Sequence, residues 1–148
     1  MIPTSTIQRP RQALSPIPQS TSTGLLHVNH LDLTTPEGRP LIRNLQLTIG
    51  KEKVALIGRN GCGKSSLLRA LAGRAEPTNG QVILPSFQYV PQELPPPNET
   101  PSEPISAGQR RRRLLLTAFL ARPAFLLLDE PSYDLDAEGI AWLCAHLQ

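Results

Sequence analysis

The stretch VALIGRNGCGKSSLL, residues 54–68, restricts the fold more than any other part of the chain. Its first four residues form a continuous apolar run, which is typical of a parallel strand buried on both faces. Gly58, Gly61 and Gly63 follow, and they allow the backbone to curl so that successive N–H groups point inward. A helical pattern then begins near Lys64, and the dipole at its N-terminal end favours an anion. The segment therefore predicts a strand, a phosphate-binding loop and a helix in succession.

The spacing of the loop residues narrows the class of ligand. Gly58, Gly63, Lys64 and Ser65 fit the pattern G-x-x-x-x-G-K-[ST]. In this pattern the lysine reaches the β- and γ-phosphates of a nucleotide, and the hydroxyl ligates Mg²⁺. The alternative is a glycine-rich turn that carries a lysine by chance, and the flanking strand and helix argue against it. The residues predicted to bind the nucleotide are Gly58, Arg59, Asn60, Gly61, Cys62, Gly63, Lys64, Ser65 and Ser66.

A second constellation lies in AFLLLDEP, residues 124–131. Its apolar run predicts a buried strand that delivers Asp129 and Glu130 to the strand's C-terminal end, where open α/β sheets bind ligands. Asp129 is expected to hold Mg²⁺ through water, and Glu130 to accept a proton from an attacking water. An acidic cap between a strand and a loop is the alternative, which the phosphate-binding loop makes less favoured.

The remaining pattern alternates between strand and helix. Residues 25–33 and 44–49 predict two strands joined by a turn at 34–40. Two short strands are expected at 81–85 and 87–91, after a turn at 78–80. This order indicates an α/β architecture with parallel central strands.

Two further helices are expected in the C-terminal part. Residues 114–120 suit a helix that ends before Pro123. The last helix carries Ile140, Leu143, Cys144 and Leu147 at helical spacing, after Asp136 as the N-cap. These four side chains form the expected apolar face of that helix.

Composition sets the outer limits of the interpretation. Residues 1–23 are rich in Ser, Thr, Pro and Gln and predict a disordered tail, so residues 24–148 form the one expected domain. The net charge of +3 includes two arginines of this tail, and the remaining +1 does not favour a nucleic-acid partner. Cys62 and Cys144 lack metal-ligand spacing and suit a reducing cytoplasm. No apolar run is long enough for a membrane span, so no direct membrane insertion is expected.

Four segments in order resemble the motifs of the ATP-binding cassette (ABC) ATPases. GRNGCGKSSLLRALAG resembles Walker A, YVPQ the Q-loop, SAGQRRRR the signature, and LLLDEPSYDLD Walker B with the D-loop. The stretch LDAEGIAWL looks closest to the soluble ABC-F branch, whose members pair two cassettes and act on ribosomes. TPEGRPLI and NGCGKSSL would also suit the ATPases of transporters. The resemblance implies a P-loop NTPase core with a small N-terminal antiparallel β part.

The resemblance also implies an activity and partners. Members of this family bind Mg-ATP and hydrolyse it between two cassettes, so the implied partners are ATP and a second cassette, as a homodimer or a paired domain. A ribosome or a transporter membrane subunit would be the further partner. The implied location is the cytoplasm.

Individual roles follow from matching the motifs residue by residue. Gln92 becomes the Q-loop glutamine that senses the γ-phosphate and Mg²⁺, Glu130 the catalytic base, and Asp136 the D-loop aspartate. The resemblance implies Ser65, Gln92 and Asp129 as the residues that hold Mg²⁺. The signature residues that would cap the ATP of a second cassette are Ser106, Ala107, Gly108 and Gln109.

Several departures from the family pattern bear on turnover. Ala107 replaces the first signature glycine, and LTTPEG, residues 33–38, offers no aromatic ring to stack on adenine. Residues 93–105 form a proline-rich linker, thirteen residues with five prolines, which is too short for the family's helical subdomain. The chain also stops before the family's switch-histidine strand, and His146 lies off the apolar face and is expected at the surface. Impaired hydrolysis, or a nucleotide-binding module without significant turnover, is therefore the alternative.

The basic run Arg110–Arg113 raises a nucleic-acid hypothesis. Successive helix residues are rotated by about 100°, so four neighbouring arginines cannot present one face to a phosphate backbone. No aromatic residue interleaves with them. A solvated helix start is therefore favoured over contact with RNA.

Overall fold

The computed structural model describes residues 24–94 and 105–148. The predicted tail and most of the predicted linker lie outside these ranges. In chain order the described elements are β1 (Leu26–Thr34), β2 (Pro40–Ile49), α1 (Lys64–Leu71), β3 (Asn79–Ile83), β4 (Phe87–Val90), α2 (Ala107–Leu120), β5 (Phe125–Leu128) and α3 (Ala137–His146). None of the helices in the described ranges has the length and apolar character to cross a membrane.

Three strands form an antiparallel sheet in the order β2-β1-β3. In β1, Leu26 and Val28 and then Leu31 and Leu33 are buried in one core cluster. The alternation shifts by one residue at His30, where φ is 50° and the pairing register is irregular. This cluster also holds the buried side of α1. The two predicted N-terminal strands are confirmed, but β2 begins at Pro40, four residues before the predicted start, so the turn is shorter than predicted.

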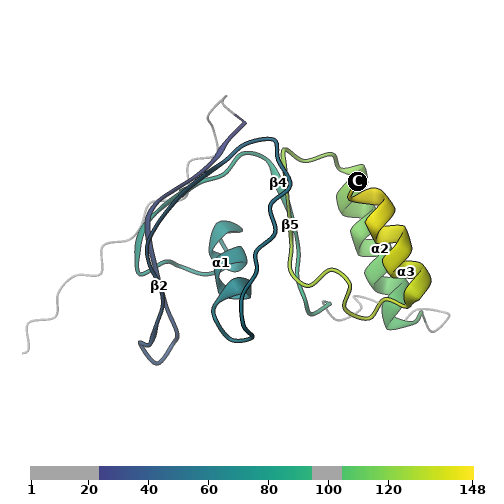
Figure 1. Ribbon diagram of the computed structural model, residues 1–148, viewed down its shortest axis with the longest axis horizontal. Helices are drawn as coiled ribbons and strands as arrows, with labels where there is room; N and C mark the ends of the chain where they lie inside the picture. The colour runs from purple at the N-terminus through teal and green to yellow at the C-terminus, as the bar shows by residue number, and fades with distance from the viewer. Residues whose placement is uncertain (1–23, 95–104) are drawn as a thin grey trace, which may run out of the picture.

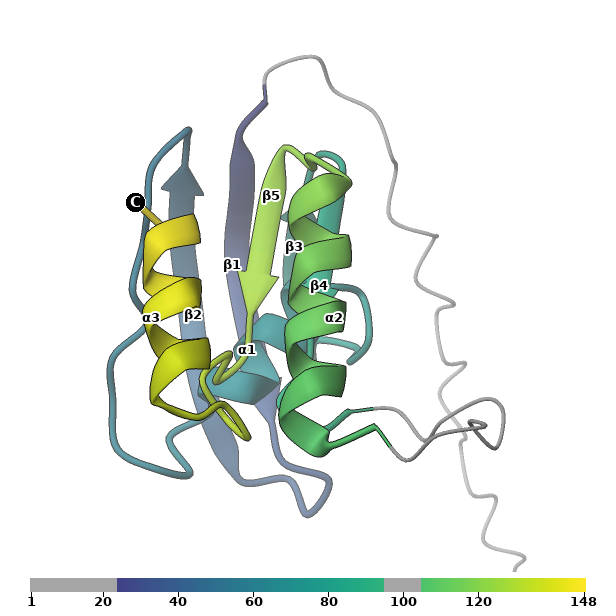
Figure 2. The same cartoon turned by 90° about the vertical axis from the view of Figure 1, so that its right-hand side faces the viewer.

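The other two strands, β4 and β5, pair in parallel although they are far apart in the sequence. Side chains alternate between two faces, so Leu127 joins the core with α1, while Leu126 and Leu128 pack toward α2 and α3. Figures 1 and 2 show the resulting layers, with α1 between the antiparallel sheet and the β4–β5 pair, and α2 and α3 side by side on the opposite face of that pair. The α/β class with a parallel pair and an antiparallel N-terminal part is confirmed.

The prediction of a buried strand at residues 54–57 is wrong for this structure. The segment has no strand assignment, and the exposed fractions are 60% for Val54 and 89% for Ile57. A strand is buried on both faces only where neighbouring strands pair with it and other layers cover it. Within residues 24–94 and 105–148, no strand pairs with this segment. The apolar run still leads into the phosphate-binding loop, but it forms no strand hydrogen bonds with the described strands.

The predicted turn at residues 78–80 is also partly wrong, because β3 already begins at Asn79. Asn79 pairs with Asp32 of β1, so strand pairing begins within the predicted turn. Gly80 has a φ of 92° there and lies close to the backbone of His30.

The apolar face predicted for α3 is rotated relative to the face that packs. Leu143 is buried, but Ile140 and Cys144 are exposed. The packed face instead includes Trp142 and His146, whose rings contact Phe119 of α2. Because the rings of Trp142 and His146 contact Phe119, the position of α2 decides which side of α3 is covered. His146 is exposed, as expected, yet its ring stacks on Phe119 with centroids 5.4 Å apart.

Gly80 provides a test of the β1–β3 register. A Cβ at this position would lie 2.4 Å from the carbonyl oxygen of His30, and φ is positive, so Gly80→Ala should destabilise the fold. Gly38→Ala is the matched control, because Gly38 has a φ of 86° but no atom within 4 Å of the added Cβ. We expect Gly80→Ala to lower the free energy of unfolding by about 1 to 2 kcal/mol more than Gly38→Ala. Urea unfolding measures both, and equal losses would contradict the register.

Candidate functional site

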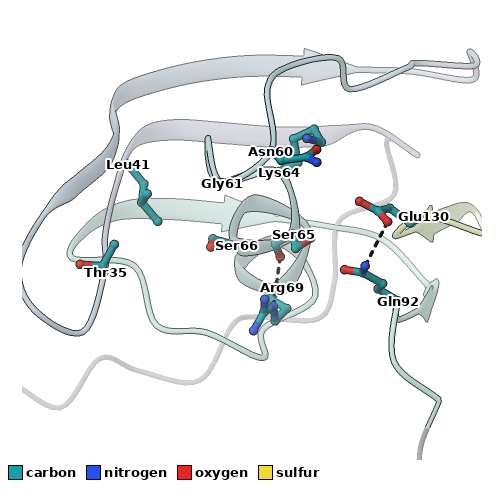
Figure 3. A pocket seen from close by; sticks show the side chains of 11 residues that line it. Thr35, Leu41, Asn60, Gly61, Lys64, Ser65, Ser66, Arg69, Gln92 and Glu130 are labelled. Carbon is teal, nitrogen blue, oxygen red and sulfur yellow. Dashed lines mark hydrogen bonds between the residues drawn. The ribbon is translucent and has the colours of Figure 1, made fainter. Parts of the chain in front are cut away.

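One pocket gathers residues from four parts of the chain, and its volume is about 510 Å³. The loop before α1 and α1 itself form its floor, the N-terminal sheet contributes one wall, and the ends of β4 and β5 contribute the other (Figure 3). The lining residues are Thr35, Leu41, Asn60, Gly61, Gly63, Lys64, Ser65, Ser66, Arg69, Gln92 and Glu130.

The glycine-rich loop has the curled backbone that its sequence predicts. Gly61 and Gly63 have φ values of 78° and 100°, which only glycine adopts readily. Lys64 then begins α1, and its Nζ donates to the carbonyl oxygens of Gly58 (3.0 Å) and Arg59 (3.1 Å). The lysine side chain therefore folds back over the loop and keeps its charge beside the loop backbone.

The loop residues divide into two groups. Asn60, Gly61 and the residues from Gly63 to Ser66 line the pocket, whereas Gly58, Arg59 and Cys62 do not. Gly58 instead lies under the side chain of Cys62, whose Sγ would be 2.7 Å from an added Cβ. The carbonyl oxygens of Gly58 and Arg59 accept hydrogen bonds from Lys64.

Asp129 follows β5 and is almost fully buried, with 4% of its surface exposed. One of its carboxylate oxygens accepts a hydrogen bond from Ser65 Oγ at 2.9 Å, and the other accepts one from the Tyr89 hydroxyl at 3.3 Å. Asp129 lies behind Ser65 and does not line the pocket itself. The carboxylate is thus connected to the first turn of α1.

Tyr89 is a site residue that sequence reasoning missed. Burial raises the pKa of its hydroxyl, and the negative charge of Asp129 raises this pKa further, so the group stays protonated and donates. The Arg74 guanidinium lies over its ring, 5.1 Å from the centroid. Only the parallel register of β4 and β5, which pairs Tyr89 with Leu127, brings the tyrosine beside Asp129.

Gln92 and Glu130 meet at the edge of the pocket. Gln92 Nε2 donates to Glu130 Oε2 at 3.0 Å, and both side chains line the pocket (Figure 3). Glu130 has a φ of 47°, a left-handed conformation that costs a non-glycine residue about 1 to 3 kcal/mol. The strained turn holds this carboxylate at the end of β5.

The four predicted signature residues lie outside the pocket. Ser106 caps α2 by accepting from the Gln109 backbone, and the Gln109 side chain accepts from the Ser106 backbone in return. Gly108 packs against the carbonyl oxygen of Asp134, which would be 2.7 Å from an added Cβ. Ala107 is the first residue of the helix. None of these residues lines the pocket of their own chain.

Asp136 has a local role in the structure. Its side chain caps α3 by accepting a hydrogen bond from the Gly139 backbone at 2.7 Å. The predicted N-cap of α3 is thus confirmed, while Asp136 does not line the pocket.

The prediction that the basic run Arg110–Arg113 is a solvated helix start is wrong for Arg111. Arg111 is fully buried, whereas Arg113 is exposed and Arg112 lies between these extremes. Arg112 pairs with Glu138 at 3.4 Å and lies over the Trp142 ring of α3. Helical rotation sends the neighbouring side chains in different directions, and one of them points into the core.

None of the described residues that line the pocket carries an aromatic ring that could stack on a nucleotide base. Thr35 and Leu41 come from the N-terminal sheet instead, and Leu41 packs against Gly63. An aliphatic side chain and a hydroxyl offer less stacking to a base than an aromatic ring does.

The polar groups near Ser65 fit Mg²⁺ that arrives with a nucleotide. Within the described residues, no cluster of three or more His, Cys, Asp or Glu side chains could hold a metal by itself. Mg²⁺ takes oxygen ligands and keeps several waters and phosphates when it binds with a nucleotide, so it requires only one or two protein ligands. Ser65 and Gln92 carry side-chain oxygens at the pocket, and the Asp129 carboxylate lies within hydrogen-bond distance of Ser65.

Comparison with known proteins identifies the class. A sequence profile described as ABC transporter matches residues 42–103. The zinc import ATP-binding protein ZnuC of Haemophilus ducreyi is 32% identical, over 85% of this chain and 62% of ZnuC. The cytochrome c biogenesis ATP-binding export protein CcmA of Pseudomonas fluorescens is 31% identical, over 74% of this chain and 75% of CcmA. This chain belongs to the ABC transporter ATPase family.

Two other similarities complete the comparison. The ATP-binding protein Uup-like of Haemophilus influenzae is 28% identical, over 72% of this chain and 32% of that protein. A putative metal-chelate type ABC transporter, solved in an inward-facing conformation, superimposes with a TM-score of 0.67 at 24% identity, over 82% of this chain and 66% of the other. The chain spans about three fifths of the length of ZnuC.

Proposed function

We propose that this chain binds Mg-ATP in the pocket and that its chemistry is hydrolysis of the γ-phosphate. The supporting observation is that Lys64, Ser65 and the Gln92–Glu130 pair meet in one pocket, although they come from distant parts of the sequence. A phosphate-binding loop, a Mg²⁺ ligand and a base are the parts that phosphoryl transfer to water requires. Their convergence favours hydrolysis over simple anion binding.

The side chains divide the work among themselves. The loop backbone and the N-terminus of α1 surround the phosphates, and Lys64 neutralises their negative charge. Mg²⁺, held by Ser65 and Gln92 with Asp129 behind them, would supply positive charge to the phosphate oxygens. Glu130 orients the attacking water and accepts its proton, while the Gln92 amide fixes the carboxylate.

A second copy of the cassette is part of the proposal. Ser106, Ala107, Gly108 and Gln109 lie outside the pocket of their own chain, at the capped N-terminus of α2. A helix N-terminus presents N–H donors to an anion, so these residues suit the γ-phosphate of another cassette's ATP. Asp136 would lie near the same interface. Without such a partner we expect the chain to bind nucleotide with little turnover, which is the alternative function.

For the further partner, a transporter membrane subunit is the better candidate. The profile described as ABC transporter matches residues 42–103, and ZnuC and CcmA are named as import and export ATP-binding proteins. The ABC-F hypothesis, with a ribosome as partner, is supported by the similarity to the Uup-like protein, which has a lower identity of 28%. We therefore propose an ATP-binding transporter subunit and keep the ABC-F assignment as the second candidate.

The deciding experiment is a titration with Mg-ATP in which heat and released phosphate are followed in the same sample. Saturable binding with phosphate release that rises steeply with protein concentration supports a cassette that works in pairs. Binding without release at any concentration supports the binding module. The absence of binding would overturn both functions.

The Tyr89 hydroxyl offers a test of the Mg²⁺ assignment. Tyr89→Phe keeps the ring beneath Arg74 but removes the donor to Asp129, which is then less well oriented. We expect the Mg²⁺ concentration for half-maximal ATP binding to rise about tenfold. Tyr133→Phe is the control, because Tyr133 is 53% exposed. If the half-maximal Mg²⁺ concentration changes equally in the two variants, Asp129 has no role in Mg²⁺ binding.

A further inference from the structure

Arg111 occupies an unusual position for an arginine, because none of its surface is exposed. It lies on the buried side of α2 with Leu115 and Ala118, at spacings of four and seven residues. Its guanidinium extends from this helix toward the end of β4. There Nη1 donates to the carbonyl oxygen of Pro91 at 2.6 Å, and Nη2 donates to the carbonyl oxygen of Gln92.

The surroundings keep this guanidinium charged and in place. Burial lowers the pKa of Arg111, and the nearby acidic groups of Asp134 and Asp129 oppose that change. An arginine side chain remains protonated in proteins, so its planar group presents donors in a rigid fork. Among the described atoms, Nε has no hydrogen-bond partner. The two carbonyl oxygens are therefore the acceptors that hold the fork.

One of the two carbonyl groups held by Arg111 belongs to Gln92, whose side chain faces the proposed base, Glu130. The carbonyl of Gln92 is bound by Arg111, while its side chain donates to Glu130 inside the pocket. The contacts run from α2 through Arg111 to the Gln92 backbone, and from the Gln92 amide to Glu130. Both ends of Gln92 are thus fixed by groups from other elements.

We propose that Arg111 is a positioning residue for the hydrolysis reaction: it clamps the backbone of residues 91–92 so that the Gln92 amide reaches Glu130 and the γ-phosphate. This inference rests on the proposed function. It also ties the N-terminal part of α2, which carries the signature residues, to the catalytic pair of the same chain. A partner that displaces α2 would then move the Arg111 guanidinium and change the position of the Gln92 backbone.

The variants separate clamping from simple packing. Arg111→Met retains a long apolar stem but has no donors, and replacing a buried charge with a hydrophobic residue of similar volume is often tolerated. Arg111→Lys keeps the charge and reaches one carbonyl at a time. Arg113→Met removes an exposed arginine of the same helix and is the matched control.

The first measurement is amide hydrogen exchange in residues 88–94 without nucleotide. Arg111→Met should speed exchange there at least tenfold at an unchanged unfolding midpoint, with Arg111→Lys intermediate and Arg113→Met equal to wild type. This arm does not depend on ATP, so it stands even if the proposed function fails. Unchanged exchange in Arg111→Met would overturn the clamp. Unfolding of both Arg111 variants would assign the residue to the core and would also overturn it.

The second measurement is the preference for Mg-ATP over Mg-ADP, measured by calorimetry. If Arg111 acts through Gln92, then Arg111→Met and Gln92→Ala should each reduce this preference about fivefold. The double variant should lose no more than Gln92→Ala alone, because residues that act in series are not additive. Additive losses would show that Arg111 acts by another route. If the wild type binds neither nucleotide, the proposed function fails and the exchange result alone decides the clamp.

Discussion

Glu130→Gln should lower phosphate release by about 100- to 1000-fold, because the variant cannot accept a proton from the attacking water. Glutamine has the same length, and its amide oxygen still accepts the hydrogen bond from Gln92. The nucleotide site therefore stays assembled, and the affinity for Mg-ATP should change less than threefold. Phosphate release at saturating Mg-ATP measures the rate, and calorimetry measures the affinity.

The wild-type rate matters for this comparison. The signature residues lie outside their own chain's pocket, and in the proposed function they act on the ATP of a second copy, so we expect an isolated chain to turn over slowly. Misplacing the phosphate-contacting groups by about 1 Å costs on the order of 100-fold, so we expect a rate below about one per second. Glu76→Gln, at an exposed position, is the matched control. A Glu130→Gln variant that retains a third or more of the wild-type rate would remove Glu130 from the role of base.

Lys64→Ala should weaken the binding of Mg-ATP by about 1.5 to 3 kcal/mol, which is the loss of a charge-assisted contact to phosphate. In the structure, Lys64 Nζ donates to two carbonyl oxygens of the loop, Gly58 and Arg59, so the variant also removes a brace of the loop backbone. Calorimetry with the two proteins gives the difference directly.

The control for this variant is Lys51→Ala, which removes one exposed lysine that does not line the pocket. It corrects for the general loss of positive charge. The assignment of the pocket to ATP fails if Lys64→Ala and Lys51→Ala bind Mg-ATP with the same affinity.

Much of the site could be read from local spacing. The positions of Gly58, Gly61, Gly63 and Lys64 predict the loop and the helix start, because the conformation of a few consecutive residues depends mainly on their own backbone preferences. For such features the interacting residues are neighbours in the sequence.

Burial could not be read in this way. The apolar run at 54–57 looks like a core strand, yet its exposure depends on which strands pair beside it. The apolar spacing in α3 predicts one face, but the packing against α2 selects another that includes His146. Periodicity states which side chains lie together on an element, while only the packing partner decides which of them is covered.

Arg111 and Tyr89 show the same division within the site. Helical geometry alone shows that the four arginines point in different directions. The parallel pairing of β4 and β5, and the packing of α2 on that pair, decide that Arg111 points at Pro91 and Gln92. The same pairing sets Tyr89 beside Asp129. The sequence by itself determined the phosphate-binding loop, the acidic pair and the order of the elements apart from the strand expected at 54–57. The tertiary structure decided which side chains support them, because these contacts join residues 19 to 40 positions apart, and no local preference encodes such a meeting.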